Sequence, residues 1–174
     1  LHMHTASNIL LTRRSIRQYK PLQITDDQLN AILTAGLFAP SAMNEQAWKL
    51  VAIQNPNELQ KVAQAAMSMT GSADSPFYNA PTLIIVFVQK DAIAPLSDGA
   101  LCLGNMMNQA KALGLGSCWI HCVIDLFQTE EGRALKVQWS VPDDYQAVGS
   151  CIVGIPDEAP AAKPRAKDTV TVLK

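Results

Sequence analysis

The stretch Thr82-Leu83-Ile84-Ile85-Val86-Phe87-Val88-Gln89 sets the architecture of this chain. Its centre is apolar and rich in β-branched residues, with no alternation between polar and apolar side chains. A strand with this pattern is buried on both of its faces rather than on one. We therefore predict a central strand that other elements cover from both sides.

Further elements lie before and after this strand. Leu29, Ile32 and Leu33 fall on one face of a helix that Thr25 or Asp26 is expected to cap. The same reasoning gives helices at 25–37, 57–69, 98–113 and 129–137, and strands at 50–53, 82–89, 117–124 and 147–155. Helices and strands thus interleave with irregular connections, which favours a sheet with helices on both faces.

The segment 98–113 predicts a helix that is apolar on nearly all sides. After Asp98, its only charged residue is Lys111. Ser97 or Asp98 is expected to cap this helix, and Gly114 is expected to end it. A helix of this kind must be covered nearly all round. It is therefore either the central helix of the domain or a seam between two subunits.

The length of the chain, 174 residues, suits one domain with a sizeable core. We expect residues 1–6 to be a flexible or vector-derived start, and residues 156–174 to be an extended C-terminal arm that packs on a partner subunit. Only 17% of the residues are charged, so a partner is expected to cover part of the apolar surface. The formal net charge of -1 gives no support for nucleic-acid binding.

The four cysteines are typical of reduced thiols in an otherwise ordinary chain. No apolar run approaches the length of a membrane span. No apolar signal region stands at the start of the sequence. We therefore expect a cytoplasmic protein without a membrane partner.

A dense basic cluster, Arg13-Arg14-Ser15-Ile16-Arg17, lies near the start of the chain. Arginine forks match the oxygens of a phosphate group in a bidentate way. Lys163 and Arg165 form a second, sparser basic pair, and folding could join the two clusters into one phosphate site. The alternative is that Arg13 and Arg14 end a short helix, where the helix dipole favours positive charge.

The loop at 39–48 offers neutral polar groups beside a large aromatic ring. Ser41, Asn44 and Gln46 provide hydrogen-bond donors and acceptors, and Trp48 provides a flat apolar surface. Such a set suits a planar heterocycle with carbonyl and imino edges. The alternative is a polar turn in which Ser41 and Asn44 satisfy backbone groups.

The segment 113–122 contains glycines that permit a sharp turn, but it is not a dinucleotide fingerprint, because it follows a helix rather than a strand. Cys118, His121 and Cys122 raise the question of a metal site. On a strand, the two cysteines would lie about 13 Å apart, which is too far for one zinc ion. We therefore expect no metal, and the order and spacing of the residues support no Ser-His-Asp or Cys-His arrangement.

Together these motifs resemble the FMN-dependent nitroreductase family. The segments that carry the resemblance, in chain order, are 13–17, 39–48, 98–120, 154–156 and 163–165. The resemblance implies an α+β fold with three layers, αβα, around a central mixed sheet. It also implies a homodimer with one FMN in each of two sites at the subunit interface, in a small member with a short lid.

The same resemblance implies roles for single residues. The phosphate would be held by Arg13, Ser15, Lys163 and Arg165. Arg17 would lie towards the ribityl and pyrimidine side, where a cation stabilises the negative charge of the reduced flavin. His121 and Cys122 would lie beside the N5 edge. The residues that would reach the flavin of the partner subunit are Pro40, Ser41 and Asn44. The remaining members of the cofactor-binding set are Arg14 and Gln46.

The implied activity is that of an oxidoreductase that takes hydride from NADH or NADPH. It would pass the hydride by a ping-pong mechanism through flavin N5 to a nitroaromatic, a quinone or a similar small acceptor. No catalytic side chain is required, and His121 and Cys122 are the candidates nearest N5. The family often has Gly-Gly or Glu-Gly at these two positions, and Gln-Pro-Trp where this chain has Gln46-Ala47-Trp48. The alternatives are a flavin carrier or sensor without nicotinamide turnover, and a different flavin reaction on the same fold.

Overall fold

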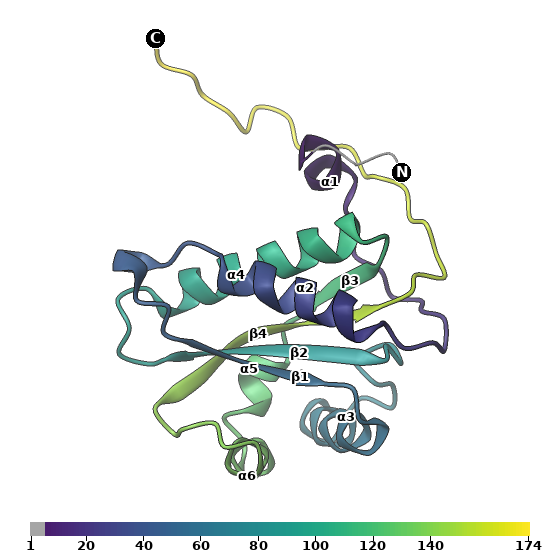
Figure 1. Cartoon of the computed structure of the whole chain (residues 1–174), viewed down its shortest axis with the longest axis vertical. Helices are drawn as coiled ribbons and strands as arrows, with labels where there is room; N and C mark the ends of the chain where they lie inside the picture. The colour runs from purple at the N-terminus through teal and green to yellow at the C-terminus, as the bar shows by residue number, and fades with distance from the viewer. Residues whose placement is uncertain (1–5) are drawn as a thin grey trace.

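A central sheet organises the protein, which a computed structural model describes for residues 6–174. Its four strands stand in the order β1 (Trp48–Ile53), β2 (Thr82–Gln89), β4 (Tyr145–Gly154) and β3 (Gly116–Ile120). Each neighbouring pair of strands is antiparallel (Figure 1). The predicted strand at 82–89 therefore has a partner on each side, as its apolar sequence requires.

The resemblance implied a mixed sheet, whereas all pairings among the four strands are antiparallel and the parallel element is one bridge between Ser15 and Ser117. A helix between two strands often belongs to a crossover that keeps the strands parallel. Here α3 (Pro56–Thr70) lies between β1 and β2 in the chain, yet these strands are neighbours that run in opposite directions. The alternation of helices and strands in the sequence does not determine the direction of the strands.

Helices cover both faces of the sheet (Figure 1). On one face lie α2 (Asp26–Leu37) and α4 (Pro95–Ala112), with the short helix α1 (Ala6–Thr12) beyond them. The helices on the other face are α3, α5 (Val123–Leu126) and α6 (Glu130–Gln138). This arrangement confirms the α+β class and the three layers.

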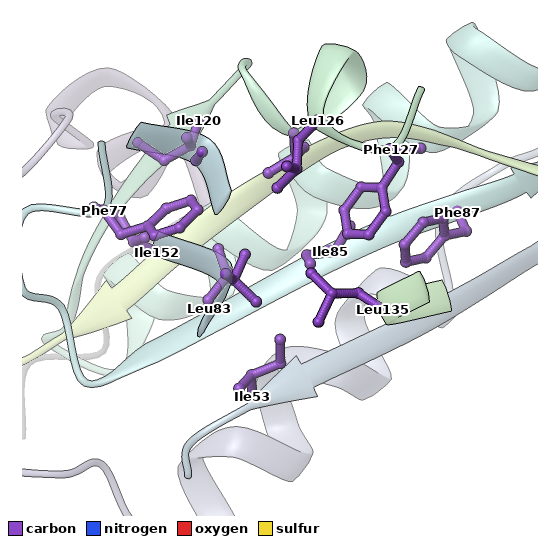
Figure 2. Close-up of a cluster of buried hydrophobic side chains, with 14 of the residues drawn as sticks. Ile53, Phe77, Leu83, Ile85, Phe87, Ile120, Leu126, Phe127, Leu135 and Ile152 are labelled. Atoms are coloured by element: carbon purple, nitrogen blue, oxygen red, sulfur yellow. The ribbon is translucent and has the colours of Figure 1, made fainter. Parts of the chain in front are cut away.

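The two faces of β2 contribute to two separate hydrophobic cores. Leu83, Ile85 and Phe87 pack with residues of α3, α5 and α6 in the cluster that Figure 2 shows. The Phe87 ring meets Phe127 edge to face, with ring centroids 4.9 Å apart. The residues that point to the other core, under α2 and α4, are Ile84, Val86 and Val88. All six side chains are fully buried, which confirms the prediction for this strand.

The predicted helix at 25–37 is confirmed as α2. Thr25 is its N-cap residue and forms a capping box with Gln28. The predicted start of α4 is wrong, because the helix begins at Pro95, with Ala94 in the cap position. Proline is well suited to the first turn of a helix. Because the helix begins at Pro95, Asp98 lies inside its first turn and not at the cap. Gly114, with φ of 76°, follows the end of α4 as expected.

The predicted strand at 117–124 is only partly correct. β3 ends at Ile120, and Val123 begins the short helix α5. The β-branched residues favoured a strand locally, but Val123 and Leu126 of α5 are fully buried in the core. Tertiary packing overrides the local preference at this point. The predicted helix at 129–137 is confirmed as α6, with Thr129 as its N-cap residue.

The two ends of the chain differ in structure. The start predicted at 1–6 falls mostly outside the described residues, and Ala6 already belongs to α1. The arm after β4 contains no helix or strand within residues 156–174, and it runs away from the sheet (Figure 1). The segment 169–173 is exposed, so its pairing with another subunit stays a prediction. Along residues 6–174, no helix combines the length and apolarity needed to cross a membrane.

Candidate cofactor site

The arginine cluster lies beside β3. The backbone N–H of Ile16 donates to the Ser117 carbonyl at 3.0 Å, and Ser15 forms the parallel bridge with Ser117. Gly116 permits this close approach, because a Cβ atom at position 116 would lie 3.0 Å from three side-chain atoms of Ile16. A glycine that the sequence analysis assigned to a turn therefore positions the arginine segment.

The same segment is also bonded to the residues that follow β4. The Lys20 N–H donates to the Ile155 carbonyl at 2.9 Å, and the Asp157 N–H donates to the Gln18 carbonyl at 2.9 Å. The Arg17 N–H donates to the carboxylate of Glu158. The arginine segment thus lies between β3 and the first residues of the C-terminal arm.

A pocket of about 300 Å³ opens where the end of α1, the end of α4 and the start of the arm meet. Its charged lining residues are Arg13, Arg14, Lys111 and Glu158. Three cations and one carboxylate leave an excess of two positive charges. This balance matches a doubly charged phosphate group, which arginine and lysine bind by charge-assisted hydrogen bonds.

The arginines of the cluster have different partners. Arg14 Nη1 donates to the carbonyls of Leu11 at 2.9 Å and Arg13 at 2.7 Å, so this side chain caps the end of α1. The helix-end interpretation is therefore correct for Arg14. Among the residues the structure describes, the Arg13 side chain has no hydrogen bond or ion pair, which leaves it available to a ligand. The Arg17 guanidinium lies over the Tyr78 ring, 5.8 Å from its centroid.

The second basic pair does not line this pocket. Lys163 and Arg165 are exposed and lie further along the arm, beyond the lining residues at 156–160. Closure of the site by these two residues stays a prediction. Lys111 supplies the third cation instead, and the sequence analysis missed it. The signal was present, because Lys111 is an isolated charge on an otherwise apolar helix.

The loop between α2 and β1 forms a separate polar group at the other end of α4 (Figure 1). Ser41 Oγ accepts the backbone N–H of Gln46 at 3.0 Å, and Asn44 Oδ1 accepts Gln46 Nε2 at 3.0 Å. Ser41 thus stabilises a polar turn, as one interpretation expected. Pro40, Asn44 and Gln46 are exposed.

Three residues of this loop have left-handed backbone conformations. Met43, Asn44 and Gln46 have φ values of 48°, 58° and 51°, a region that residues other than glycine seldom occupy. Strained conformations of this kind persist only where the surroundings impose them, and they cluster at functional sites. The loop is therefore a strong candidate for ligand or subunit contact.

Asp98 holds this loop in place, a role that the sequence analysis missed. Its Oδ1 accepts the backbone N–H of Ala42 at 3.0 Å. Its Oδ2 is buried and has no hydrogen-bond partner within residues 6–174. An unpartnered buried carboxylate oxygen is costly. A donor from outside the described residues, such as a water molecule, a ligand or a second chain, would satisfy this oxygen.

His121 and Cys122 follow the end of β3. His121 is exposed, and its carbonyl accepts the N–H of Ile124 at 3.0 Å as α5 begins. Cys122 is half-buried, and burial raises the pKa of its thiol. The lining of the Arg13 pocket includes neither residue. The structure therefore leaves their place beside a flavin as a prediction.

Comparison with known proteins identifies the family of this fold. A sequence profile described as the Nitroreductase family matches residues 10–75 and 68–155. A protein of Archaeoglobus fulgidus, provisionally named NADH dehydrogenase/NAD(P)H nitroreductase, is 30% identical over 162 residues, covering 90% of this chain and 88% of its own length.

Solved structures agree with the sequence comparison. A nitroreductase with bound FMN from Bacteroides fragilis superposes with a TM-score of 0.88 at 29% identity, covering 97% of this chain and 98% of that one. An FMN-dependent nitroreductase from Clostridium difficile gives a TM-score of 0.80 at 26% identity, covering 95% and 98% of the two chains. The profile match, the sequence relative and the shared fold lead to one conclusion: this chain belongs to the nitroreductase family.

Proposed function

We propose that this protein is an FMN-dependent NAD(P)H oxidoreductase that reduces a nitroaromatic, a quinone or a similar small acceptor. The observation that carries the proposal is the pocket in which Arg13, Arg14 and Lys111 outnumber Glu158 by two charges. Its excess charge fits the phosphate of FMN, and solved structures of the same fold contain bound FMN. NADH or NADPH is the proposed reductant, in keeping with the name of the Archaeoglobus relative.

FMN, when bound, supplies the chemistry of accepting hydride and passing it on. The residues of this chain bind and orient it. Arg13 and Lys111 provide cations for the phosphate, and the buried backbone at Ser117 fixes the segment that carries Arg13. We assign Arg17 the role of stabilising negative charge on the pyrimidine side. Lys163 and Arg165 are proposed to reach the phosphate from the arm.

We also propose that the protein is a homodimer in which each site is shared. The loop held by Asp98 and the pocket lined by Lys111 lie at opposite ends of α4, about 20 Å apart at 1.5 Å per residue. One chain therefore cannot bring both groups to the same small ligand, but a partner's loop can complete the site. On the side of the sheet that α1, α2 and α4 cover, the exposed apolar residues include Leu10, Leu37, Phe38, Leu96 and Leu101.

Two broader expectations accompany this proposal. We propose that the chain forms a single nitroreductase domain, in keeping with the profile match over residues 10–155. We also propose a cytoplasmic location, which is supported by the four free thiols at Cys102, Cys118, Cys122 and Cys151.

The test of the proposal combines binding and reduction. The FMN-saturated protein is expected to bleach when NADH or NADPH is added without oxygen. Arg13→Ala is expected to weaken FMN binding about 100-fold, because loss of charge-assisted bonds costs about 3 kcal/mol. Lys20→Ala, which removes an exposed cation outside the pocket, serves as the control. Equal FMN affinity in the two variants would remove the basis of the proposal.

A second candidate function, flavin binding without nicotinamide turnover, is favoured by one observation. An exposed histidine side chain stands at position 121, where the family often has glycine or glutamate. In that case FMN binds tightly and neither nicotinamide bleaches it. His121→Gly is then expected to restore bleaching. If the wild-type protein bleaches, this candidate is excluded.

A further inference from the structure

A second positively charged pocket lies on the opposite side of the sheet from α4. Its volume is about 320 Å³, and it is formed by α6, the start of β4 and the residue after β2. Its charged lining residues are Lys90, Arg133, Lys136 and Asp143. The excess of two positive charges equals that of the Arg13 pocket, on a chain whose net charge is -1.

Lys136 forms the floor of this pocket. It is only 5% exposed, which is rare for lysine. Its Nζ donates to the Tyr145 carbonyl at 2.6 Å and to the Asp143 carbonyl at 3.3 Å. The Asp143 carboxylate is 4.0 Å away and its side chain is 98% exposed, so it neutralises the buried ammonium only weakly.

Unlike Lys136, the other two cations have no carboxylate partner within the described part of the chain. Arg133 Nη2 donates to the Gln128 carbonyl at 3.0 Å, and the rest of the guanidinium is unpaired among residues 6–174. The Lys90 ammonium forms no hydrogen bond or ion pair there. Burial, together with the charges of Lys90 and Arg133, lowers the pKa of Lys136, although Asp143 and Asp144 act in the opposite direction.

These cations are close enough to repel one another, and a bound anion would relieve that repulsion. The other residues of the lining include the polar residues Gln128, Tyr145 and Gln146. The volume exceeds that of a lone phosphate ion. The pocket therefore has room for the polar body of a ligand as well as for its charged group.

We propose that this pocket binds a small phosphate monoester at a site distinct from the cofactor site. The pocket includes Tyr145, Gln146 and Ala147, at the first residues of β4, whereas the Arg13 pocket includes Pro156, just after its last residue. The ten residues of β4 separate the two by about 30 Å. One ligand of this size cannot occupy both.

The experiment is a nuclear magnetic resonance titration of the FMN-saturated protein with inorganic phosphate and with glycerol 3-phosphate, at ionic strength held constant with chloride. FMN occupies the Arg13 pocket, so the added anion reports on the second one. We expect saturable shifts of the Lys90, Tyr145 and Gln146 amides and of the Arg133 Nε–H, with the monoester binding more tightly than inorganic phosphate.

Lys90→Gln/Arg133→Gln is expected to weaken this binding about tenfold or more, because it removes two charge-assisted contacts at exposed positions. Lys61→Gln, which removes a surface cation that pairs with Glu58, is the matched control and should leave binding unchanged. Three results would overturn the proposal: the same shifts when chloride is added in place of phosphate, shifts that persist in the double variant, or shifts confined to residues around Arg13 and Lys111. Because the shifts are assigned to residues, this result does not depend on whether FMN turnover is observed.

Discussion

The buried carboxylate of Asp98 accepts the backbone N–H of Ala42 at 3.0 Å and so connects the first turns of α4 to the loop before β1. That loop contains the left-handed residues Met43, Asn44 and Gln46. A single hydrogen bond thus links the central helix to the segment proposed to complete the partner's site. The Oδ2 of the same carboxylate is buried and has no hydrogen-bond partner within residues 6–174.

Replacement of Asp98 tests whether its hydrogen bond to Ala42 stabilises the loop. Asp98→Ala removes the acceptor for the Ala42 N–H, and we expect the free energy of unfolding to fall by about 1–3 kcal/mol. Asp98→Asn keeps an acceptor oxygen and should cost less. Urea unfolding measures both, with the exposed Asp91→Ala as control. A loss in Asp98→Ala no larger than in Asp91→Ala would show that the contact does not stabilise the loop.

The contact between Gly116 and Ile16 offers a second test. A Cβ at position 116 would lie 3.0 Å from Ile16, so Gly116→Ala should displace the arginine segment and weaken FMN binding. Ile16→Ala/Gly116→Ala should recover part of that affinity, because alanine lacks the two Cγ atoms of Ile16 that the added Cβ would meet. Gly104→Ala is the control, since among residues 6–174 no atom outside its chain neighbours and the backbone of its own helix lies within 4 Å of the added Cβ. Fluorescence titration with FMN measures all three, and additive losses in the double variant would contradict the prediction.

The proposed dimer face can be tested by charge. Leu101 lies on α4 and is 48% exposed, and Leu101→Glu should shift the protein towards monomer, because a carboxylate is costly in an apolar interface. FMN affinity should fall with it, since each site would lose the partner's loop. Val137→Glu places the same charge on α6, on the opposite face, and should leave the mass unchanged in sedimentation equilibrium. Dissociation by both variants, or by neither, would place the interface elsewhere.

Glu58 gives a prediction about pH. Its carboxylate accepts Lys61 Nζ at 2.6 Å, Gln138 Nε2 at 3.0 Å and Trp139 Nε1 at 3.3 Å, and so connects α3 to α6 and its C-cap residue. Hydrogen bonds from Lys61 and Trp139 lower the pKa of Glu58 in the folded protein. Its contribution to stability is therefore present above the unfolded-state pKa of about 4.3 and is lost as the pH falls through the lower folded-state pKa.

The measurement is urea unfolding of wild type and Glu58→Gln between pH 7 and pH 3. The wild type should be more stable at neutral pH, and the difference should shrink as the pH falls below about 4.3. Glu131→Gln on α6 is the control, because Glu131 has no hydrogen bond or ion pair within residues 6–174. A stability difference that stays constant down to pH 3 would contradict the assignment.

The residues that the sequence identified correctly are those whose signal is local. Leu83 to Val88 form a buried strand because every side chain is apolar, whichever face it points to. Thr25, one of the two caps expected for its helix, fills that role because the cap bond reaches only three residues along the chain. The order of the motifs was also sufficient to indicate the family. None of these features depends on where the rest of the chain lies.

Tertiary structure alone decided the composition of the candidate site. Arg17 meets Glu158 across 141 residues of chain, and Ala42 meets Asp98 across 56. Lys111 joins Arg13 because α4 and the arginine segment end at the same edge of the sheet. Val123 has a local preference for a strand, but it begins helix α5 because its side chain is buried in the core there. The sequence alone determined most of the elements, because their patterns repeat over a few residues. Which side chains share a pocket depends on contacts between distant segments, and only the packed structure sets those.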